Sequence, residues 1–123
     1  MPEAQHSVLI VDDEPDIRDS LTAVLEAEGY TVMEAEHGEE ALRRLRASPD
    51  AICIILLDLY MPTMNGWTFR NQQLSDPSLA SIPVIVITAD AAAARKARQL
   101  GVIGAMTKPL DLDQLLQLIA AHC

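Results

Sequence analysis

Residues 52–57 form an unbroken run of apolar side chains, Ile52-Cys53-Ile54-Ile55-Leu56-Leu57. A strand with one face in water alternates polar and apolar residues, whereas a short run without alternation is typical of a strand buried on both faces. Strands of that kind occur in parallel sheets that helices cover on both sides. This run therefore predicts an α/β fold built on a parallel sheet.

Two other apolar runs resemble the first, and all three lead into polar side chains. The runs are residues 7–11 before Asp12 and Asp13, residues 52–57 before Asp58, and residues 83–87 before Thr88. Because ligands of parallel sheets bind beyond the carboxyl ends of the strands, we expect these groups to lie at one edge, together with Lys108. Crowded carboxylates repel one another, so such an edge requires a hard cation or a change of protonation.

Helix-like segments alternate with strand-like segments along the chain. Pro15 suits a first helical turn, Asp90 suits an N-cap, and Gly101 suits a helix end. We expect helices over residues 15–28, 38–47, 66–74, 90–101 and 111–121, and further strands over residues 30–35 and 102–107. Five strands alternating with five helices predict a doubly wound, five-stranded parallel sheet in a single domain of residues 1–123, with a folded core over about residues 7–121.

The composition excludes several classes of protein. The net charge of −9 disfavours direct binding to nucleic acid or to anionic membranes. The N-terminal residues do not resemble a signal peptide, and no apolar run is long enough to cross a bilayer. Two cysteines give no disulfide framework, so we expect Cys53 to be a small core residue and Cys123 to be a mobile terminal residue. This cysteine usage favours a reducing compartment, and we predict a cytoplasmic protein.

Each candidate site residue also has a simpler interpretation. Asp12 and Asp13 could cap the following helix, because carboxylates accept hydrogen bonds from free N–H groups there. Asp58 could open a turn, Thr88 could be an ordinary strand residue, and Lys108 could be a surface residue. The combination is more informative than any one residue, because four strand ends each supply a group that suits phosphoryl chemistry.

This combination resembles the receiver domain of the bacterial two-component response-regulator family. The matching residues are Asp12-Asp13, Asp58, Met61-Pro62 with Asn65-Gly66, Thr88-Ala89 and Lys108-Pro109. Their order and spacing fit over essentially the whole chain. The resemblance implies a flavodoxin-like fold with the strand order 2-1-3-4-5. It also implies a signalling domain that loses its phosphoryl group by its own hydrolysis, and not a turnover enzyme.

The resemblance implies that Asp58 is the nucleophile that takes a phosphoryl group from a phosphohistidine. The donor would be a sensor histidine kinase or a histidine phosphotransfer protein, and the product would act on a downstream protein target. Asp13, Asp58 and the backbone carbonyl of Tyr60 would bind Mg²⁺ or Mn²⁺, with Asp12 acting through a coordinated water.

The phosphoryl oxygens have their own predicted partners. Lys108, the Thr88 hydroxyl and the Ala89 N–H would contact them. The Lys108–Pro109 peptide bond would be cis, as in the family. Ile17, Ser20 and Leu110 could form the docking surface for the donor, although Ile17 suits a core position equally well.

The sequence departs from the receiver pattern at Ala105. Receivers usually carry Tyr or Phe three residues before the lysine, and this ring moves together with the counterpart of Thr88. We therefore expect the threonine part of the switch to remain and the aromatic part to be absent or replaced. Met106 is adjacent, but strand alternation should direct it to the opposite face.

Several residues have less specific interpretations. Tyr60 and Asp90 occupy rim positions that could control access of water to the phosphoryl group. The basic cluster Arg95, Lys96 and Arg98 is expected chiefly to complement a helix C-terminus, and it could also make output contacts, for which receivers commonly use this helix. The histidines, which are expected to be surface residues that pair with no likely metal ligand, are His6, His37 and His122.

Two other functions compete with a phosphoryl-accepting receiver. A degenerate receiver would serve only as a protein-interaction module, and Ala105 is the residue that favours it. A phosphotransferase or phosphatase of the haloacid-dehalogenase type would need an acid two residues after its nucleophile. Tyr60 occupies that position here, and the chain leaves no room for the usual cap domain.

Overall fold

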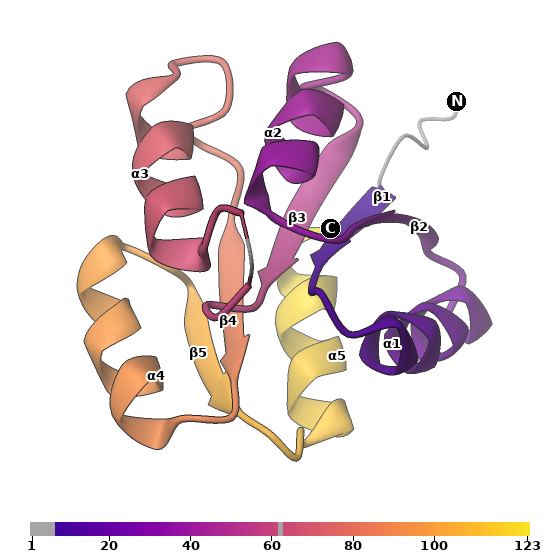
Figure 1. Cartoon of the computed structure of the whole chain (residues 1–123). Helices are drawn as coiled ribbons and strands as arrows, with labels where there is room; N and C mark the ends of the chain where they lie inside the picture. The colour runs from indigo at the N-terminus through magenta and orange to yellow at the C-terminus, as the bar shows by residue number, and fades with distance from the viewer. Residues whose placement is uncertain (1–6, 62) are drawn as a thin grey trace.

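A five-stranded parallel sheet forms the centre of the molecule, and helices cover both of its faces (Figure 1). The computed structural model describes residues 7–61 and 63–123. The strands are β1 (Ser7–Val11), β2 (Thr31–Ala35), β3 (Ile52–Leu57), β4 (Val84–Thr88) and β5 (Gly104–Thr107). Their spatial order is β2-β1-β3-β4-β5, so the predicted doubly wound, flavodoxin-like fold is confirmed.

The helices form one layer on each side of the sheet. They are α1 (Pro15–Ala27), α2 (Gly38–Ala47), α3 (Gly66–Ser75), α4 (Ala91–Ala97) with the short 3₁₀ helix η1 (Arg98–Leu100), and α5 (Leu112–His122). One apolar core lies between the sheet and α1 and α5, and the other lies between the sheet and α2, α3 and α4. In the described residues, no helix combines the length and the apolar character needed to span a membrane.

Strand β3 has the position that its apolar run predicts. It lies between β1 and β4, and residues Ile54 to Leu57 are almost fully buried. Ile54 and Leu56 pack in the core beneath α1 and α5, whereas Ile55 and Leu57 pack in the opposite core. The unbroken apolar pattern thus exists because both faces of this strand contact a layer of helices.

Polar side chains cap the N-termini of four helices, and only the cap at Asp90 was predicted. Asn65, Asp90 and Asp111 each accept a hydrogen bond from a backbone N–H of the first turn that follows. His37 does the same for α2, because its Nδ1 accepts a hydrogen bond from the Glu40 N–H at 3.2 Å. This capping role of His37 was not predicted.

The prediction of two unpaired cysteines was wrong, because Cys53 and Cys123 form a disulfide. Cys53 is the second residue of β3, and Cys123 directly follows α5. A helix that follows a parallel strand runs back along the sheet, so the end of α5 returns to the edge where β3 begins. Their Cα atoms lie 5.4 Å apart although 70 residues separate them in the sequence. With both cysteines bonded, the cysteine content no longer supports a reducing compartment.

Two predicted element boundaries differ from the structure by more than one residue. Helix α4 ends at Ala97 and continues only as the 3₁₀ turn to Leu100, where Gly101 closes it in the left-handed conformation at φ +73°. Strand β5 begins at Gly104, two residues later than predicted. The predictions for His6 and Pro62 lie outside the described residues.

Helix α3 contains a buried polar pair that the sequence did not reveal. Arg70 is 5% exposed and donates hydrogen bonds to the carbonyl oxygens of Leu100 and Gly101 and to the side chain of Gln73. The Gln73 amide donates in turn to the carbonyl oxygens of Leu79 and Ile82. This pair therefore fastens α3 to the segment before β4 and to the segment before β5.

Candidate functional site

Three carboxylates meet at the carboxyl edge of the sheet. Asp12 and Asp13 follow β1 and Asp58 follows β3, and each offers an oxygen within 4.8 Å of the others. Ladder hydrogen bonds fix this edge, because the Asp58 N–H donates to the Val11 carbonyl at 2.9 Å. Asp12 and Asp58 are buried and Asp13 is exposed. The sequence prediction that these groups lie at one edge is therefore confirmed by the geometry.

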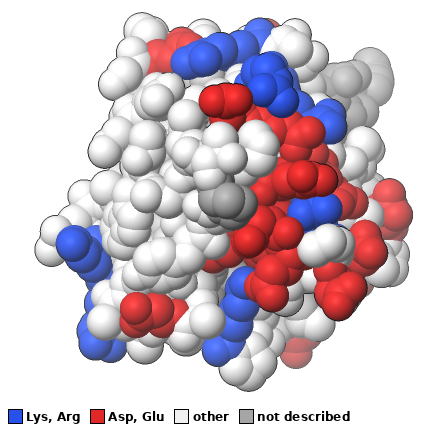
Figure 2. Space-filling model, in the orientation of Figure 1, with Lys and Arg blue, Asp and Glu red and all other residues white. Residues whose placement is uncertain are grey.

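These carboxylates belong to a larger acidic surface. Figure 2 shows acidic side chains gathered on the side of the molecule that carries α1 and β2, with few basic side chains among them. We call this surface the acidic face and define it by Asp12, Asp13, Glu14, Glu34, Glu36, Glu40 and Asp58. A dense field of negative charge of this kind attracts cations.

The charged form of Asp58 is costly in this position. Burial is the main cause that raises the pKa of Asp58 to about 6, and the negative charge of Asp12 is the second. The positive charge of Lys108 and the backbone N–H groups of Tyr60 and Leu59 oppose this rise without cancelling it. A cation beside Asp58 would relieve the same repulsion and favour its ionised form.

Lys108 lies on the α1 side of the site. Its Nζ is 3.2 Å from Asp12 Oδ2 and 3.4 Å from Glu14 Oε1. In the described part of the chain, Lys108 makes no ion pair with Asp58 within 4.0 Å. Burial lowers the pKa of Lys108, but the charges of Asp12 and Asp58 outweigh burial and leave that pKa raised. The sequence prediction missed Glu14, whose only signal was its position next to Asp13.

Thr88 ends β4 beside Lys108, and Ala89 follows the strand. The Lys108 N–H donates to the Thr88 carbonyl at 2.8 Å, and the Thr88 side chain is fully buried. The Thr88 hydroxyl accepts a hydrogen bond from the Asp90 N–H at 3.3 Å. Asp90 caps α4 through its own carboxylate, which confirms the helix-cap interpretation. Ala89 is exposed, and the Lys108–Pro109 peptide bond is cis.

The loop after Asp58 packs tightly against the start of α3. The Gly66 N–H donates to the Leu59 carbonyl at 2.9 Å. A Cβ atom at Gly66 would lie 2.5 Å from the Asp58 carbonyl oxygen and 2.8 Å from Leu59 Cα, so only glycine fits there. The Tyr60 side chain is 54% exposed and lies at the rim.

Arg18 supports the end of β1 from α1. Its guanidinium donates to the Asp12 carbonyl at 2.7 Å and to Glu34 of β2 at 3.1 Å. The Thr22 hydroxyl donates a hydrogen bond to the second carboxylate oxygen of Glu34 at 2.9 Å. Arg18 was missed because a lone arginine in a predicted helix carries no signal of a long-range contact.

Ala105 and Met106 alternate across the sheet as predicted. Ala105 packs against the core beneath α2, α3 and α4, whereas Met106 is buried in the opposite core. The carbonyl of Ala105 accepts a hydrogen bond from Arg98, at 3.3 Å. Lys96 lies over the ring of Trp67, 5.7 Å from its centroid, so this contact joins α4 to α3. Two of the three basic residues in the cluster thus contact their own domain.

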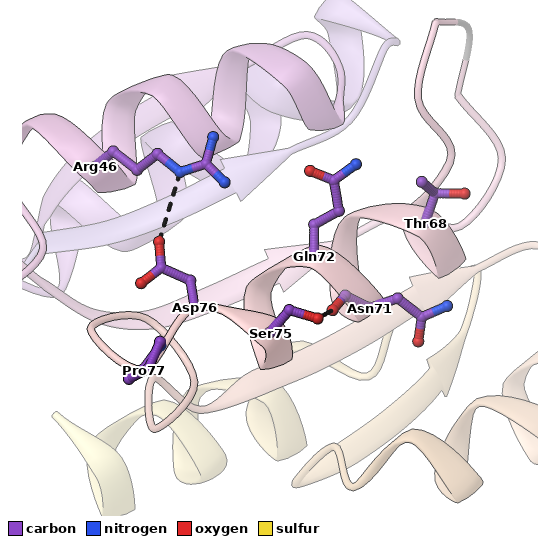
Figure 3. Close-up of a pocket in the computed structure, with 7 residues that line it drawn as sticks. All are labelled: Arg46, Thr68, Asn71, Gln72, Ser75, Asp76 and Pro77. Atoms are coloured by element: carbon purple, nitrogen blue, oxygen red, sulfur yellow. Dashed lines mark hydrogen bonds and ion pairs between the residues drawn. The ribbon is translucent and has the colours of Figure 1, made fainter.

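Two hollows lie near these elements. One, of about 240 Å³, adjoins the site and is lined by Ile17, Ser20, Leu21, Lys108, Pro109, Leu110 and Leu112. The other, of about 440 Å³, lies between α2 and α3 and is shown in Figure 3. Its polar walls include the Arg46–Asp76 ion pair, with a nitrogen-to-oxygen distance of 3.6 Å. The first hollow contains all three residues of the predicted docking surface.

Known proteins share this fold and sequence pattern. The chain matches the family model for the response regulator receiver domain over residues 8–120. It is 36% identical over 117 residues to Protein PilH of Pseudomonas aeruginosa. The alignment covers 93% of this chain and 94% of PilH.

Solved structures agree with this family match. A response regulator receiver protein from Pseudomonas putida superposes with a TM-score of 0.86 at 29% identity, over 98% of this chain and 99% of the other. The response regulator TrrA from Thermotoga maritima, in complex with Mg²⁺-BeF, has a TM-score of 0.84 at 26% identity, over 96% and 99% of the two chains. On its sequence and its structure, this chain belongs to the response regulator receiver domain family.

Proposed function

We propose that this protein accepts a phosphoryl group on Asp58 in a reaction that depends on Mg²⁺. The observation that carries the proposal is the meeting of three carboxylates within 4.8 Å beside the ammonium group of Lys108. Receiver domains are signalling modules that bind Mg²⁺ at such an acidic pocket and interact with sensor histidine kinases and downstream targets. The donor proposed here is a phosphohistidine on a histidine kinase or a histidine phosphotransfer protein.

Asp58 would act as the nucleophile. Its carboxylate oxygen forms a bond to phosphorus while the bond from phosphorus to the histidine nitrogen breaks, and the imidazole leaves with the bonding electrons. The product is an acyl phosphate on Asp58. The raised pKa of about 6 still leaves the carboxyl ionised at neutral pH, so no separate general base is needed.

The residues at the site suit Mg²⁺ or Mn²⁺. All candidate ligands are oxygen atoms, and the repulsion that raises the pKa of Asp58 is of the kind that a hard cation relieves. Asp13, Asp58 and the Tyr60 carbonyl would hold the ion, and Asp12 would hold one of its waters. The bound ion would neutralise charge on the carboxylates and the phosphoryl oxygens. The Mg²⁺-BeF complex of TrrA supports this assignment by similarity.

Lys108, Thr88 and Ala89 would bind the transferred group. Lys108 Nζ would move toward the phosphoryl oxygens from its resting contacts with Asp12 and Glu14. The Thr88 hydroxyl and the Ala89 N–H would donate hydrogen bonds to the same oxygens. All three residues lie at the ends of β4 and β5, which supports these roles.

The donor would dock at the hollow beside Lys108. Ile17 is half-buried and Ser20 is exposed on α1, and Leu110 adjoins them from the segment before α5. An apolar hollow beside Lys108 would admit a side chain of a donor helix and so align the phosphohistidine with Asp58. A cytoplasmic location and a single domain over the chain remain predictions that accompany this role.

The switch would use Thr88 without an aromatic partner. Ala105 has no side chain that can rotate, so the response would pass through the loop after Thr88 and through α4. Crystal structures with and without a phosphoryl mimic test this account. If that loop and α4 occupy the same positions in both structures, this account of switching fails.

Intact-mass spectrometry after incubation with acetyl phosphate tests the function itself. We expect one phosphoryl adduct that requires Mg²⁺ and is absent from the Asp58→Asn variant. Phosphorylation without any structural response would favour the degenerate receiver, which acts as an interaction module alone. Repeated turnover of added phosphomonoester would favour a phosphatase, although the exposed Tyr60 stands where that class needs an acid.

A further inference from the structure

We propose that Glu14 is a positioning residue that retains Lys108 on the α1 side of the site until a phosphoryl group arrives. This inference rests on the proposed function of Asp58. Glu14 would set how readily Lys108 is released, and thus how fast Asp58 is phosphorylated.

Glu14 contacts both partners of the resting ion pair. Its side-chain Oε1 lies 3.4 Å from Lys108 Nζ, and its backbone N–H donates to Asp12 Oδ1 at 2.9 Å. The other oxygen of Asp12 lies 3.2 Å from the same Nζ. Glu14, Asp12 and Lys108 therefore form a closed triangle of contacts at the end of β1.

The local structure leaves the Glu14 carboxylate available for this contact. Glu14 is the N-cap residue of α1, with extended backbone angles of φ −92° and ψ 112°. Its side chain accepts no hydrogen bond from the first turn of the helix, unlike those of the four other α-helix N-cap residues in the described chain. The carboxylate instead reaches across the site to a residue 94 positions away in the sequence.

The contact with Glu14 opposes movement of Lys108 toward Asp58. The pull of Asp58 on Lys108 is opposed by two carboxylates that Lys108 already contacts. A phosphoryl group on Asp58 can bind the Lys108 ammonium group only if at least one of these two contacts lengthens. Asp12 is buried and Glu14 is 61% exposed at its side chain, so the Glu14 contact is the one that solvent can replace.

The size of the effect follows from the exposure of the pair. Exposed ion pairs contribute about 0.2–1 kcal/mol, which corresponds to a change of roughly 1.4- to 5-fold in an equilibrium or a rate. We therefore expect Glu14→Gln to speed adduct formation with acetyl phosphate by about 1.4- to 5-fold at saturating Mg²⁺. Intact-mass spectrometry over a time course measures this rate.

Asp16→Asn is the matched control. It removes the same single charge from the first turn of α1, is exposed, and makes no ion pair with Lys108. If losing one negative charge acted only by weakening the protein's repulsion of acetyl phosphate, both variants would be phosphorylated faster by the same factor. The proposed role requires a clearly larger acceleration in Glu14→Gln.

A double-mutant cycle tests whether Glu14 acts through Lys108. In a Lys108→Met background, Glu14→Gln should leave the rate unchanged relative to Lys108→Met alone. Equal acceleration in both backgrounds, or equal rates for Glu14→Gln and Asp16→Asn, would overturn the role of Glu14 and leave the phosphorylation of Asp58 intact. Failure of the unaltered protein to form any adduct would instead overturn the proposed function, and this inference with it.

Discussion

Asp58 combines burial with a neighbouring negative charge, and both oppose its ionisation. Its pKa in the folded protein is about 6, above the ordinary value of 3.8. Between these two pH values the folded state binds more protons than the unfolded state. Below pH 3.8 the Asp58 carboxyl therefore does not change the free energy of unfolding. As the pH rises from 3.8 through 6, its ionisation progressively lowers that free energy.

Replacing this carboxyl with an uncharged amide is expected to stabilise the metal-free protein. Asp58→Asn should raise the free energy of unfolding by about 1–3 kcal/mol at pH 7.5, because it removes the buried charge. The gain should shrink toward zero near pH 4, where Asp58 is already neutral. Urea unfolding in EDTA at both pH values measures it. The exposed Asp19→Asn should show neither effect, and a gain of equal size at both pH values would contradict this explanation.

Gly66 is constrained by the closeness of the Asp58 backbone. Gly66→Ala should destabilise the fold by about 1–3 kcal/mol, because the added Cβ meets backbone atoms that cannot move aside. It should also slow phosphorylation by displacing the Asp58 carbonyl. Gly104→Ala is the control, since its nearest neighbour is the end of the Leu118 side chain at 3.0 Å. The two variants are compared by thermal unfolding and by the rate of adduct formation in mass spectrometry. Equal losses of stability and of rate in both variants would refute the steric argument.

At the scale of elements, the Arg70–Gln73 pair holds α3 to two other segments. Arg70→Met would leave the carbonyls of Leu100 and Gly101 without this buried donor. Since each unsatisfied buried group costs about 1–3 kcal/mol, we expect a loss of about 2–4 kcal/mol in the free energy of unfolding. Arg46→Met, which breaks only the half-exposed pair with Asp76, should cost less than about 1 kcal/mol. Similar losses in the two variants would contradict the role given to Arg70.

The sequence predicted the elements whose signals are local. The apolar run of β3, the N-cap Asp90 and the first-turn Pro15 each act within a few residues, and each was placed correctly. The start of β5 was misplaced because Val102 and Ile103 are apolar but precede the ladder, and only the pairing of Ile85 with Gly104 decides where the strand begins.

Contacts between distant parts of the chain could not be predicted in the same way. Arg18 with Glu34, Lys108 with Glu14 and Cys53 with Cys123 depend on which strand ends and helix ends share an edge. Their residue types are common on protein surfaces, and their spacing in the sequence is unremarkable. The site carboxylates and Lys108 were predicted only because several strand ends supplied them together.

At the scale of the whole molecule, the disulfide closes most of the chain into a loop. For a sequence separation of 70 between the cysteines, the loss of freedom in the unfolded chain corresponds to about 4 kcal/mol. We expect dithiothreitol to lower the midpoint of thermal unfolding of the unaltered protein and to leave that of Cys123→Ser unchanged. An unaltered midpoint after complete reduction would show that the bond contributes little stability.

The acidic face has a consequence for the rate at which ligands arrive. Its field concentrates divalent cations near the site before any of them binds, and it slows the approach of small anions. Salt weakens both effects, because the screening length falls to about 8 Å at physiological ionic strength. Acetyl phosphate should therefore react faster as ionic strength rises, while Mg²⁺ associates more slowly. Two ligands of one site would thus respond to salt in opposite directions.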